Sequence, residues 1–356
     1  MLILSNEQIE QMLTMPACMA VLREMYRDLA DHGTLNMPRT DNIVPCNTPD
    51  AYYAFKYMGG VWPRHQIVAL RLNSDVITHP NIGNSARRVK VPLANGRWVG
   101  LVQLYSTETG ELLAMFPDGV AQRMRVGAAS GLAIDYLARP NARRAGMIGS
   151  GWQAGSQLMA LLAARPIEEV KVYSVRKESR EAFVEEARIK TGANVRAVDS
   201  AEECARDVDI LLAATSSMVP VIQPEWLSEG MHISCIKVQE VSQSVLARCD
   251  RVAIHNKSEA RQIDNILPGT PNLANEDRGG WWEQAVKHWD DFAGLPELVA
   301  GRKSGRVSDT EISCFVNNTG LGLQFAALGT ILLEQAKKRG VGTELPGEWF
   351  SETVHP

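Results

Sequence analysis

Residues 144–164 read RAGMIGSGWQAGSQLMALLAA, a short apolar segment that runs into glycines and then into a helical pattern. Between a predicted strand and a predicted helix, the spacing GxGxxA at its centre is typical of a turn that binds a dinucleotide pyrophosphate. Gly149 would permit the tight turn, Gly151 would let the backbone approach the phosphates, and Ala154 would let helix and strand pack closely. The other residues expected to line this turn are Ser150, Trp152 and Gln153.

Strand-like and helix-like segments continue to alternate after this turn, with apolar runs at 170–175, 195–198 and 209–215. This alternation predicts an α/β fold with a Rossmann-type, doubly wound parallel sheet. From Met37 to Met115, short alternating runs separated by Gly, Pro, Asn and Asp predict an antiparallel sheet instead. A long helix ends the chain. We therefore expect a discontinuous α+β substrate and dimerisation domain, 1–125 with 320–356, and a dinucleotide domain, 126–319.

The end of the second strand of the parallel sheet bears on the choice of cofactor. Enzymes that use NAD commonly place an acid there for the ribose 2′-hydroxyl. This chain has Ser174, Arg176 and Lys177 instead, which could hold a 2′-phosphate. NADP(H) is therefore the favoured cofactor and NAD(H) the alternative. If NAD(H) binds, Arg176 and Lys177 would be solvated surface residues. Thr215 and Ser216 follow the fourth strand and would line the nicotinamide pocket or make local loop hydrogen bonds.

Composition excludes several classes of function. The net charge of −4 gives no field for a polyanion, so a nucleic-acid partner is not expected. No segment has the roughly 18 apolar residues that a membrane span needs, and the start of the chain does not resemble a signal peptide. The six cysteines are scattered without a CxxC pair, so we expect neither a metal site nor disulfides, but reduced thiols in a cytoplasmic protein.

Seven segments in order resemble the ornithine cyclodeaminase/μ-crystallin family over nearly the whole chain. They are MPRT (37–40), GLVQLYSTETGELLA (100–114), RVGAASGLAIDYLAR (125–139), IGSGWQA (148–154), DILLAATSS (209–217), GMHISCIKV (230–238) and the stretch 298–324. The resemblance implies a Rossmann domain and a second domain whose sheet pairs across a homodimer. It also implies hydride transfer at an α-carbon that bears nitrogen, although some members chiefly bind cofactor and small hormones.

The resemblance assigns two arginines to the substrate carboxylate. Arg39 matches the arginine that the family has in MPRT, and Arg125 matches the arginine of a motif like RVGAAS. A guanidinium suits a carboxylate because its fork can form two parallel hydrogen bonds. A structural ion pair is the alternative role for each arginine. Asn318 matches a turn that lies beside the nicotinamide in the family, and its alternative is a loop-to-helix junction.

Several positions depart from the family pattern. The family usually has a lysine where this chain has Arg71, and Lys56 could supply an amine instead. Arg97 stands where many members have a threonine. Together with Arg39 and Arg125, these arginines could form a cationic pocket for a dicarboxylate such as iminosuccinate, unless some of them point elsewhere.

The family aspartate of cyclodeaminases is also missing. Gln239 takes its position and Glu240 follows it. Because glutamine cannot change protonation state, either Glu240 replaces the aspartate or ring closure is absent. We therefore expect an NAD(P)H-dependent reductase of α-imino acids, which runs in reverse as an amino-acid dehydrogenase. Lys56, Glu240 or water would protonate the imine. The alternatives are a cyclodeaminase acting on ornithine or lysine through Glu240, and a non-catalytic NADP(H)-binding protein.

Overall fold

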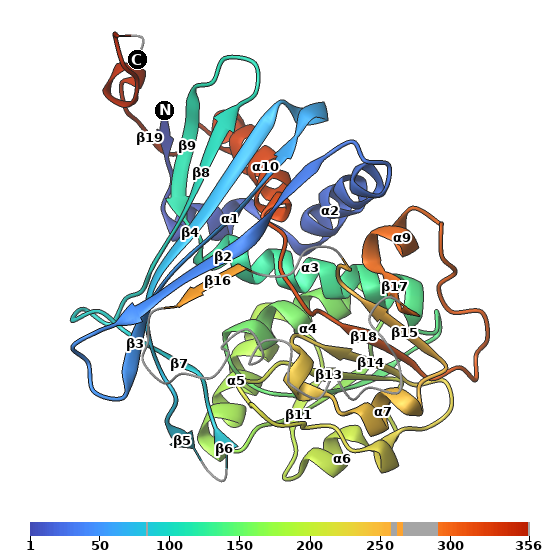
Figure 1. Ribbon diagram of the computed structural model, residues 1–356. Helices are drawn as coiled ribbons and strands as arrows, with labels where there is room; N and C mark the ends of the chain where they lie inside the picture. Colours follow the sequence, from blue (N-terminus) through green and yellow to red (C-terminus); the bar gives the residue numbers. More distant parts are fainter. Residues whose placement is uncertain (83–84, 258–261, 266–290, 355–356) are drawn as a thin grey trace.

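Two β-sheets of different type organise the chain, one above the other in Figure 1. The computed structural model describes residues 1–82, 85–257, 262–265 and 291–354. The upper sheet belongs mainly to the first third of the chain, and the lower sheet follows it in sequence. A short two-stranded hairpin, β5 (Asn81–Ile82) with β6 (Ser85–Ala86), extends from the upper sheet toward the lower one.

The larger sheet is mostly antiparallel, as its alternating sequence predicts, and comprises nine strands within the described residues. In order, they are β16 (Gln262–Asn265), β2 (Leu35–Pro45), β3 (Ala51–Trp62), β4 (Ile67–Thr78), β8 (Val99–Ser106), β9 (Leu112–Pro117), β1 (Leu2–Ile3) and β19 (Thr343–Glu344), with β7 (Val89–Val91) paired to β4. Every second residue of β4 is buried. The sheet therefore has an inner and an outer face.

Helices cover the inner face of this sheet. They are α1 (Asn6–Met12), α2 (Met15–Ala30) and α10 (Leu323–Arg339), seen together in the upper part of Figure 1. Ser5 forms a capping box with Gln8 at the start of α1, and Thr14 accepts a hydrogen bond from the first turn of α2. Trp62 and Phe325 lie fully buried between sheet and helices.

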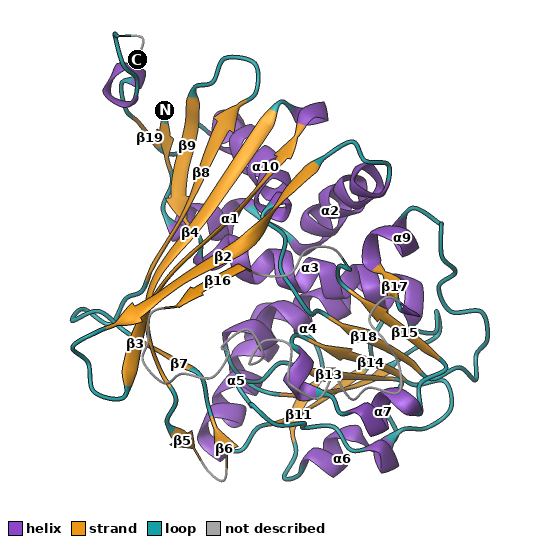
Figure 2. Cartoon of the chain, in the orientation of Figure 1, coloured by secondary structure: helices purple, strands orange, loops and turns teal. Residues whose placement is uncertain are grey.

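The smaller sheet is parallel, and the first five of its strands in the chain have the spatial order 3-2-1-4-5 of a Rossmann domain. Its strands, in spatial order, are β12 (Val195–Ala197), β11 (Glu169–Tyr173), β10 (Arg144–Ile148), β13 (Ile210–Ala213), β14 (His232–Cys235), β18 (Ser313–Val316), β15 (Arg251–Ile254) and β17 (Ala293–Gly294). Its helices are α4 (Trp152–Ala164), α5 (Lys177–Thr191), α6 (Ala201–Ala205), α7 (Gln243–Ala247) and α9 (Leu295–Val299), drawn around the sheet in Figure 2. The predicted α/β class is confirmed.

Helix α3 (Gly119–Leu137) lies between the two sheets and packs against both α2 and α4. It begins at Gly119, and so it crosses the predicted domain boundary at 125/126. Strand β16 also crosses the predicted division, because it pairs with β2 of the larger sheet. The domain limits stay a prediction. Short 3₁₀ turns lie at Pro63–His65, Pro224–Trp226, Val238–Glu240 and Gly347–Phe350.

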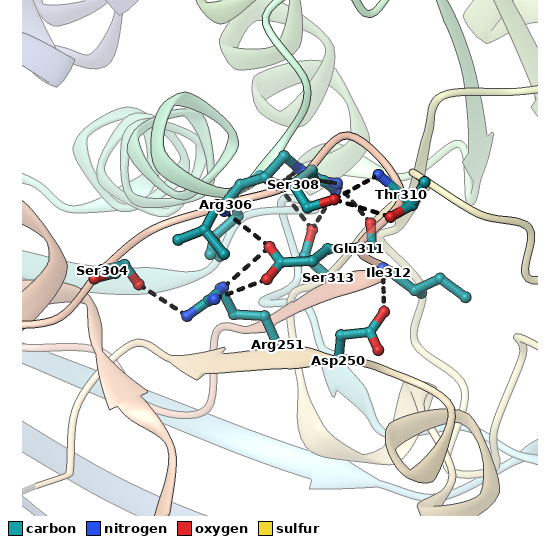
Figure 3. Close-up of polar contacts among 11 residues, drawn as sticks. Asp250, Arg251, Ser304, Arg306, Ser308, Thr310, Glu311, Ile312 and Ser313 are labelled. Atoms are coloured by element: carbon teal, nitrogen blue, oxygen red, sulfur yellow. Dashed lines mark hydrogen bonds and ion pairs between the residues drawn. The ribbon is translucent and has the colours of Figure 1, made fainter.

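A polar network closes the amino-terminal end of the parallel sheet (Figure 3). Arg306 donates through Nε to the Leu137 carbonyl oxygen (2.6 Å) and through Nη2 to Ser313 Oγ (2.9 Å). Arg251 forms an ion pair with Glu311 at 2.8 Å. These arginines fasten the loop after α9 to the strands β15 and β18. Among the described residues, no helix is both long and apolar enough to cross a membrane.

Candidate active site

The glycine turn after β10 has the geometry that its sequence predicts. Gly149 has a φ of +118°, and a Cβ there would lie 2.1 Å from the Ala214 carbonyl oxygen, so only glycine fits. A Cβ on Gly151 would meet nothing within 4 Å. The backbone at Gly151 is therefore open to an approaching group. Ala154 is fully buried where α4 packs against the sheet.

This turn borders a cavity of about 580 Å³ at the carboxyl ends of β10, β11 and β13. The lining includes Gly149, Ser150, Gly151, Trp152, Gln153, Ser174, Arg176, Thr215 and Ser216, all predicted from sequence. The N-cap of α4 is Gly151, which has no side chain to cap the helix, so the positive end of the helix dipole faces the cavity and can attract an anion. A dinucleotide diphosphate fits this end of the helix.

The residues after β11 differ in their surroundings. Ser150 Oγ donates to Ser174 Oγ at 2.9 Å, which joins the glycine turn to the end of the second strand. Arg176 is exposed and lines the cavity. Lys177, the first residue of α5, is exposed, and its Nζ lies 3.8 Å from Oε1 of Glu181, one turn later in the helix. The structure therefore brings Ser174 and Arg176, but not Lys177, to the cavity.

Glu240 is fully buried beneath the cavity. Its Oε1 accepts from the backbone N–H of Thr215 at 2.5 Å and from the Thr215 hydroxyl at 2.7 Å. Its Oε2 accepts from the backbone N–H of Ile236 at 2.9 Å. Burial raises the pKa of Glu240, and the hydrogen bonds to Thr215 oppose that rise. The carboxylate thus holds the loops after β13 and β14, and both of its oxygens are engaged by them.

A cluster of charged residues lies on the inner face of the antiparallel sheet. Asp41, Lys56, Asn73 and Gly100 are Cα partners across β2, β3, β4 and β8. Lys56 Nζ lies 2.7 Å from Asp75 Oδ2. The register of the sheet therefore places the amine of Lys56 beside the carboxylates of Asp41 and Asp75 on the inner face.

Two of the predicted arginines are paired with carboxylates of this cluster. Arg39 Nε lies 2.7 Å from Asp41 Oδ1, and Arg39 Nη2 donates to Oδ2 at 2.8 Å. Arg71 donates through Nε to Asp118 Oδ2 at 2.8 Å. Asp118 precedes α3 but does not cap it. Gly100 leaves room for Asp118, because a Cβ at that position would lie 2.1 Å from Asp118 Oδ1.

Arg125 differs from Arg39 and Arg71. It is buried on α3, and its Nη1 donates to Gln324 Oε1 at 3.1 Å. Its Nε is buried without a hydrogen-bond partner, and no carboxylate of the described residues forms an ion pair with it. Burial and the nearby charge of Arg71 lower the pKa of Arg125 to about 9. An incompletely compensated buried cation is unfavourable, so this position favours an added anion.

The surroundings of Lys56 lower its affinity for a proton. Burial and the charge of Arg88 lower the pKa of Lys56 from its usual value to about 7, while Asp75 opposes the shift. Arg39 also lowers the pKa of both Lys56 and Arg125, so its charge reaches both groups. A group with a pKa near neutrality can both donate and accept a proton under working conditions.

Contacts between the two sheets place the charged cluster beside the cavity. Arg87 lines the cavity and forms an isolated β-bridge with Ser217, whereas the charge of Arg88, one residue later, acts on Lys56. On the other side, Arg123 of α3 lies over the Trp152 ring, 4.0 Å from its centroid. Gln122, three residues before Arg125 on the same side of α3, accepts a hydrogen bond from Gln153 Nε2 at 2.7 Å, and Gln153 lines the cavity. A molecule that reaches out of the cavity would therefore meet the cluster.

Three predicted site residues lie elsewhere or in other roles. Arg97 is exposed in the loop before β8, and its charge acts on Glu7 of α1. The structure does not bring Arg97 to Arg125. Gln239 is buried within the turn after β14. Asn318 Nδ2 donates to the Asn256 carbonyl oxygen at 2.9 Å, which ties the loop before α10 to the end of β15.

Sequence reasoning missed several residues of this site. Asp75 and Asn73 alternate with apolar residues in β4, in phase with Arg71, so the period-two pattern could have indicated one shared face. Asp118, Arg87 and Gln324 gave no such local signal. They reach the site through tertiary packing.

Comparisons with known proteins agree with this architecture. Residues 91–340 match the profile of the Ornithine cyclodeaminase/mu-crystallin family. The chain belongs to this family. As a member, it is 31% identical over 352 residues to alanine dehydrogenase from Archaeoglobus fulgidus, covering 97% of this chain and 98% of that protein.

Two solved structures resemble this family member over almost its whole length. One is the Thermococcus litoralis Delta(1)-pyrroline-2-carboxylate reductase in complex with NADH and L-proline, with a TM-score of 0.78, 26% identity, and coverage of 97% of this chain and 100% of that chain. The other is an archaeal alanine dehydrogenase dimer with bound NAD, with a TM-score of 0.75, 26% identity, and coverage of 97% and 98%. The resemblance seen in the sequence segments is thereby confirmed.

Proposed function

We propose that this protein is an NAD(P)H-dependent oxidoreductase that reduces the C=N bond of an α-imino acid and, in reverse, oxidises an α-amino acid. The observation that carries the proposal is the buried guanidinium of Arg125, without an ion pair among the described residues, near the cavity that the glycine turn lines. The bound dinucleotide supplies the hydride to the imine carbon. The names of the relatives, a dehydrogenase of alanine and a reductase of pyrroline-2-carboxylate, support the same chemistry.

Arg125 would bind the carboxylate next to the imine. Its charge is not balanced by an ion pair with a carboxylate of the described residues, and a guanidinium can form two parallel hydrogen bonds with a carboxylate. Holding the carboxylate fixes the neighbouring imine carbon relative to the cavity. Such positioning replaces an entropic barrier that can amount to roughly 7–11 kcal/mol in favourable cases.

Lys56 would protonate the imine nitrogen during reduction and accept that proton during oxidation. Its lowered pKa, near 7, suits both directions, and Asp75 at 2.7 Å orients the amine. Glu240 is a poorer candidate because backbone and hydroxyl donors already engage both of its carboxylate oxygens. The cyclodeaminase reading that depends on Glu240 therefore has less support than the reductase.

The pairing of the arginines favours a substrate with one carboxylate. Arg39 already pairs with Asp41 and Arg71 with Asp118, and Arg97 lies away from the cluster. Arg125 then remains for the substrate. A dicarboxylate such as iminosuccinate would need a second anion site, for which these three arginines would have to give up their present positions.

For the cofactor, we infer a preference for NADPH over NADH. Ser174 and Arg176 line the cavity at the end of β11, and no acid is among the residues that line it within the described chain. An Arg176→Ala variant should then lose about ten-fold in affinity for NADPH and little for NADH, as one charge-assisted hydrogen bond would suggest. Equal effects on both dinucleotides would argue for NAD(H) as the natural cofactor.

We also infer a homodimer that forms through the outer face of the antiparallel sheet. Helices cover the other face, whereas Tyr53, Phe55, Tyr57, Leu70 and Leu72 are partly or largely exposed on this one. A contiguous apolar sheet face is typical of an interface. Light scattering should give twice the chain mass, and Phe55→Lys should give the monomer.

A spectrophotometric assay tests the function. Consumption of NADPH and NADH would be followed with Δ1-pyrroline-2-carboxylate, and with pyruvate or oxaloacetate plus ammonia or methylamine. Turnover of a monocarboxylate imine is the expected result. Release of ammonia from ornithine without net cofactor turnover would identify a cyclodeaminase. Tight dinucleotide binding without any turnover would identify a binding protein.

A further inference from the structure

The guanidinium of Arg125 is the first member of a buried chain of hydrogen bonds. Arg125 Nη1 donates to Gln324 Oε1 at 3.1 Å, and Gln324 Nε2 donates to the Tyr26 hydroxyl at 3.0 Å. The Tyr26 hydroxyl lies 2.5 Å from His255 Nε2, and His255 Nδ1 contacts the carbonyl oxygen of Thr319. The side chains of Tyr26, His255 and Gln324 are all fully buried.

The direction of every bond in this chain is fixed by its last acceptor. A carbonyl oxygen can only accept, so His255 Nδ1 carries a proton and donates to Thr319. Burial lowers the pKa of His255 to about 4, so the ring is neutral near pH 7 and its Nε2 is an acceptor. Tyr26 must then donate to His255 and accept from Gln324. All four bonds point away from Arg125.

The chain of hydrogen bonds connects elements that are distant in sequence. Arg125 lies on α3, Gln324 on α10 and Tyr26 on α2, whereas His255 follows β15 of the parallel sheet. Successive bonds of one direction polarise one another, and the side-chain polar atoms of Gln324, Tyr26 and His255 all have partners. The position of Arg125 is therefore tied to three helices and to the nucleotide-binding sheet.

The last acceptor of this hydrogen-bond chain is next in sequence to a residue that contacts Arg125. Thr319 lies in the loop after β18, and the next residue, Gly320, packs on the guanidinium so closely that a Cβ there would lie 2.3 Å from Arg125 Nη1. Gln324 also accepts from the backbone N–H of Leu321 at 3.1 Å. The loop thus contacts one side of the guanidinium, and the chain of hydrogen bonds holds another side.

We propose that Tyr26, His255 and Gln324 are positioning residues that hold the Arg125 guanidinium in the orientation in which it receives the substrate carboxylate. Arg125 Nε donates to none of the three, so its hydrogen-bonding capacity is not used by this network. The inference rests on the proposed function, because it takes Arg125 as the carboxylate ligand. It adds that carboxylate affinity depends on a hydroxyl and an imidazole that do not touch the substrate.

The test measures how tightly the dinucleotide-loaded protein binds pyrrole-2-carboxylate, a planar and unreactive analogue of a cyclic imino acid, together with KM and kcat for the imine. Tyr26→Phe and His255→Leu should each weaken binding and raise KM about five- to ten-fold, the effect of one lost hydrogen bond. The value of kcat should change less than two- to three-fold, and dinucleotide affinity should stay unchanged. His255→Gln, whose amide can both donate and accept, should recover part of the loss.

A double-mutant cycle separates positioning from a general structural role. In an Arg125→Ala background, Tyr26→Phe should have no further effect on carboxylate binding. Tyr105→Phe, which also removes a hydrogen-bonded hydroxyl, serves as the control and should leave binding unchanged. An equal effect of Tyr26→Phe in both backgrounds, or a lower melting temperature with unchanged KM, would overturn the inference.

The outcomes also separate this inference from the function. Wild-type protein that binds the probe while Tyr26→Phe and His255→Leu bind it equally well would overturn the positioning role alone. Wild-type protein that binds neither the probe nor an imino acid would overturn the proposed function, and the positioning role with it.

Discussion

Two arginines, the half-buried Arg306 and the buried Arg125, differ in how completely their hydrogen-bonding groups are satisfied. Arg306 uses Nε, Nη1 and Nη2 to donate to carbonyl and hydroxyl oxygens at the base of the parallel sheet (Figure 3). Arg125 donates to a glutamine and keeps a buried Nε without a partner. The saturated arginine fastens a loop, whereas the unsaturated one has the unused hydrogen-bonding capacity on which its proposed role as a carboxylate ligand rests.

The same contrast holds for two buried lysines. Lys171 Nζ, on β11, donates to the carbonyl oxygen of Arg206 at 2.6 Å. This lysine therefore ties β11 to the end of α6. Lys56 pairs with Asp75 but is surrounded by the charges of Arg39 and Arg88, which lower its pKa. Lys171 thus has a structural contact, whereas the pKa of Lys56 is lowered to about 7.

The largest expected effect comes from removing the Lys56 amine. Lys56→Gln should lower kcat for imine reduction by about 10²- to 10⁴-fold, the usual contribution of a general acid. Lys171→Gln is the matched control and should leave kcat within about two-fold where the protein remains folded. Steady-state kinetics on both variants would make the comparison, and equal losses would remove the distinction between the two lysines.

Arg125→Ala should have the next largest effect. Loss of charge-assisted hydrogen bonds to a carboxylate should lower kcat/KM by about 10²- to 10³-fold, chiefly through KM. Dinucleotide affinity and the melting temperature should change little. Arg97→Ala should alter KM less than two-fold, because the structure places Arg97 near Glu7. A large effect at Arg97 would instead support the four-arginine pocket.

The pH profile should report the lowered pKa of Lys56. Below about pH 7, Lys56 is protonated and can donate to the imine; above it, the amine is neutral. The kcat/KM for reduction should therefore fall about ten-fold per pH unit as pH rises through 7. Oxidation of the amine needs the neutral lysine, so its rate should rise through the same pH. A reduction rate that stays constant from pH 6 to 9 would contradict the role of Lys56.

Removing the saturated arginine should affect stability rather than binding. Arg306→Ala leaves several carbonyl groups without their donor and should destabilise the protein by about 2–4 kcal/mol. Thermal unfolding should show this as a drop of several degrees in the melting temperature. The KM of the folded fraction should match wild type. A raised KM with unchanged stability would reverse the contrast with Arg125.

Much of the parallel half could be predicted from sequence because its signals are local. The glycines of the turn, the alternation of strands and helices, and the cavity residues Ser174, Arg176 and Thr215 lie within short segments. Backbone geometry and helix dipoles act over a few residues, so a linear pattern suffices to place them. Arg125 was named instead through the resemblance of its segment to the family, and its burial became known from the structure.

The sequence by itself determined the fold class, the dinucleotide turn and the list of candidate cations. Only the tertiary structure decided which cations are already neutralised. Asp41, Asp75 and Asp118 pair with Arg39, Lys56 and Arg71 through the register of the antiparallel sheet and the start of α3. Charge compensation depends on distances of a few ångströms between segments far apart in the chain. One linear pattern carries no such distances, so the guanidinium left for a ligand became apparent only in the folded molecule.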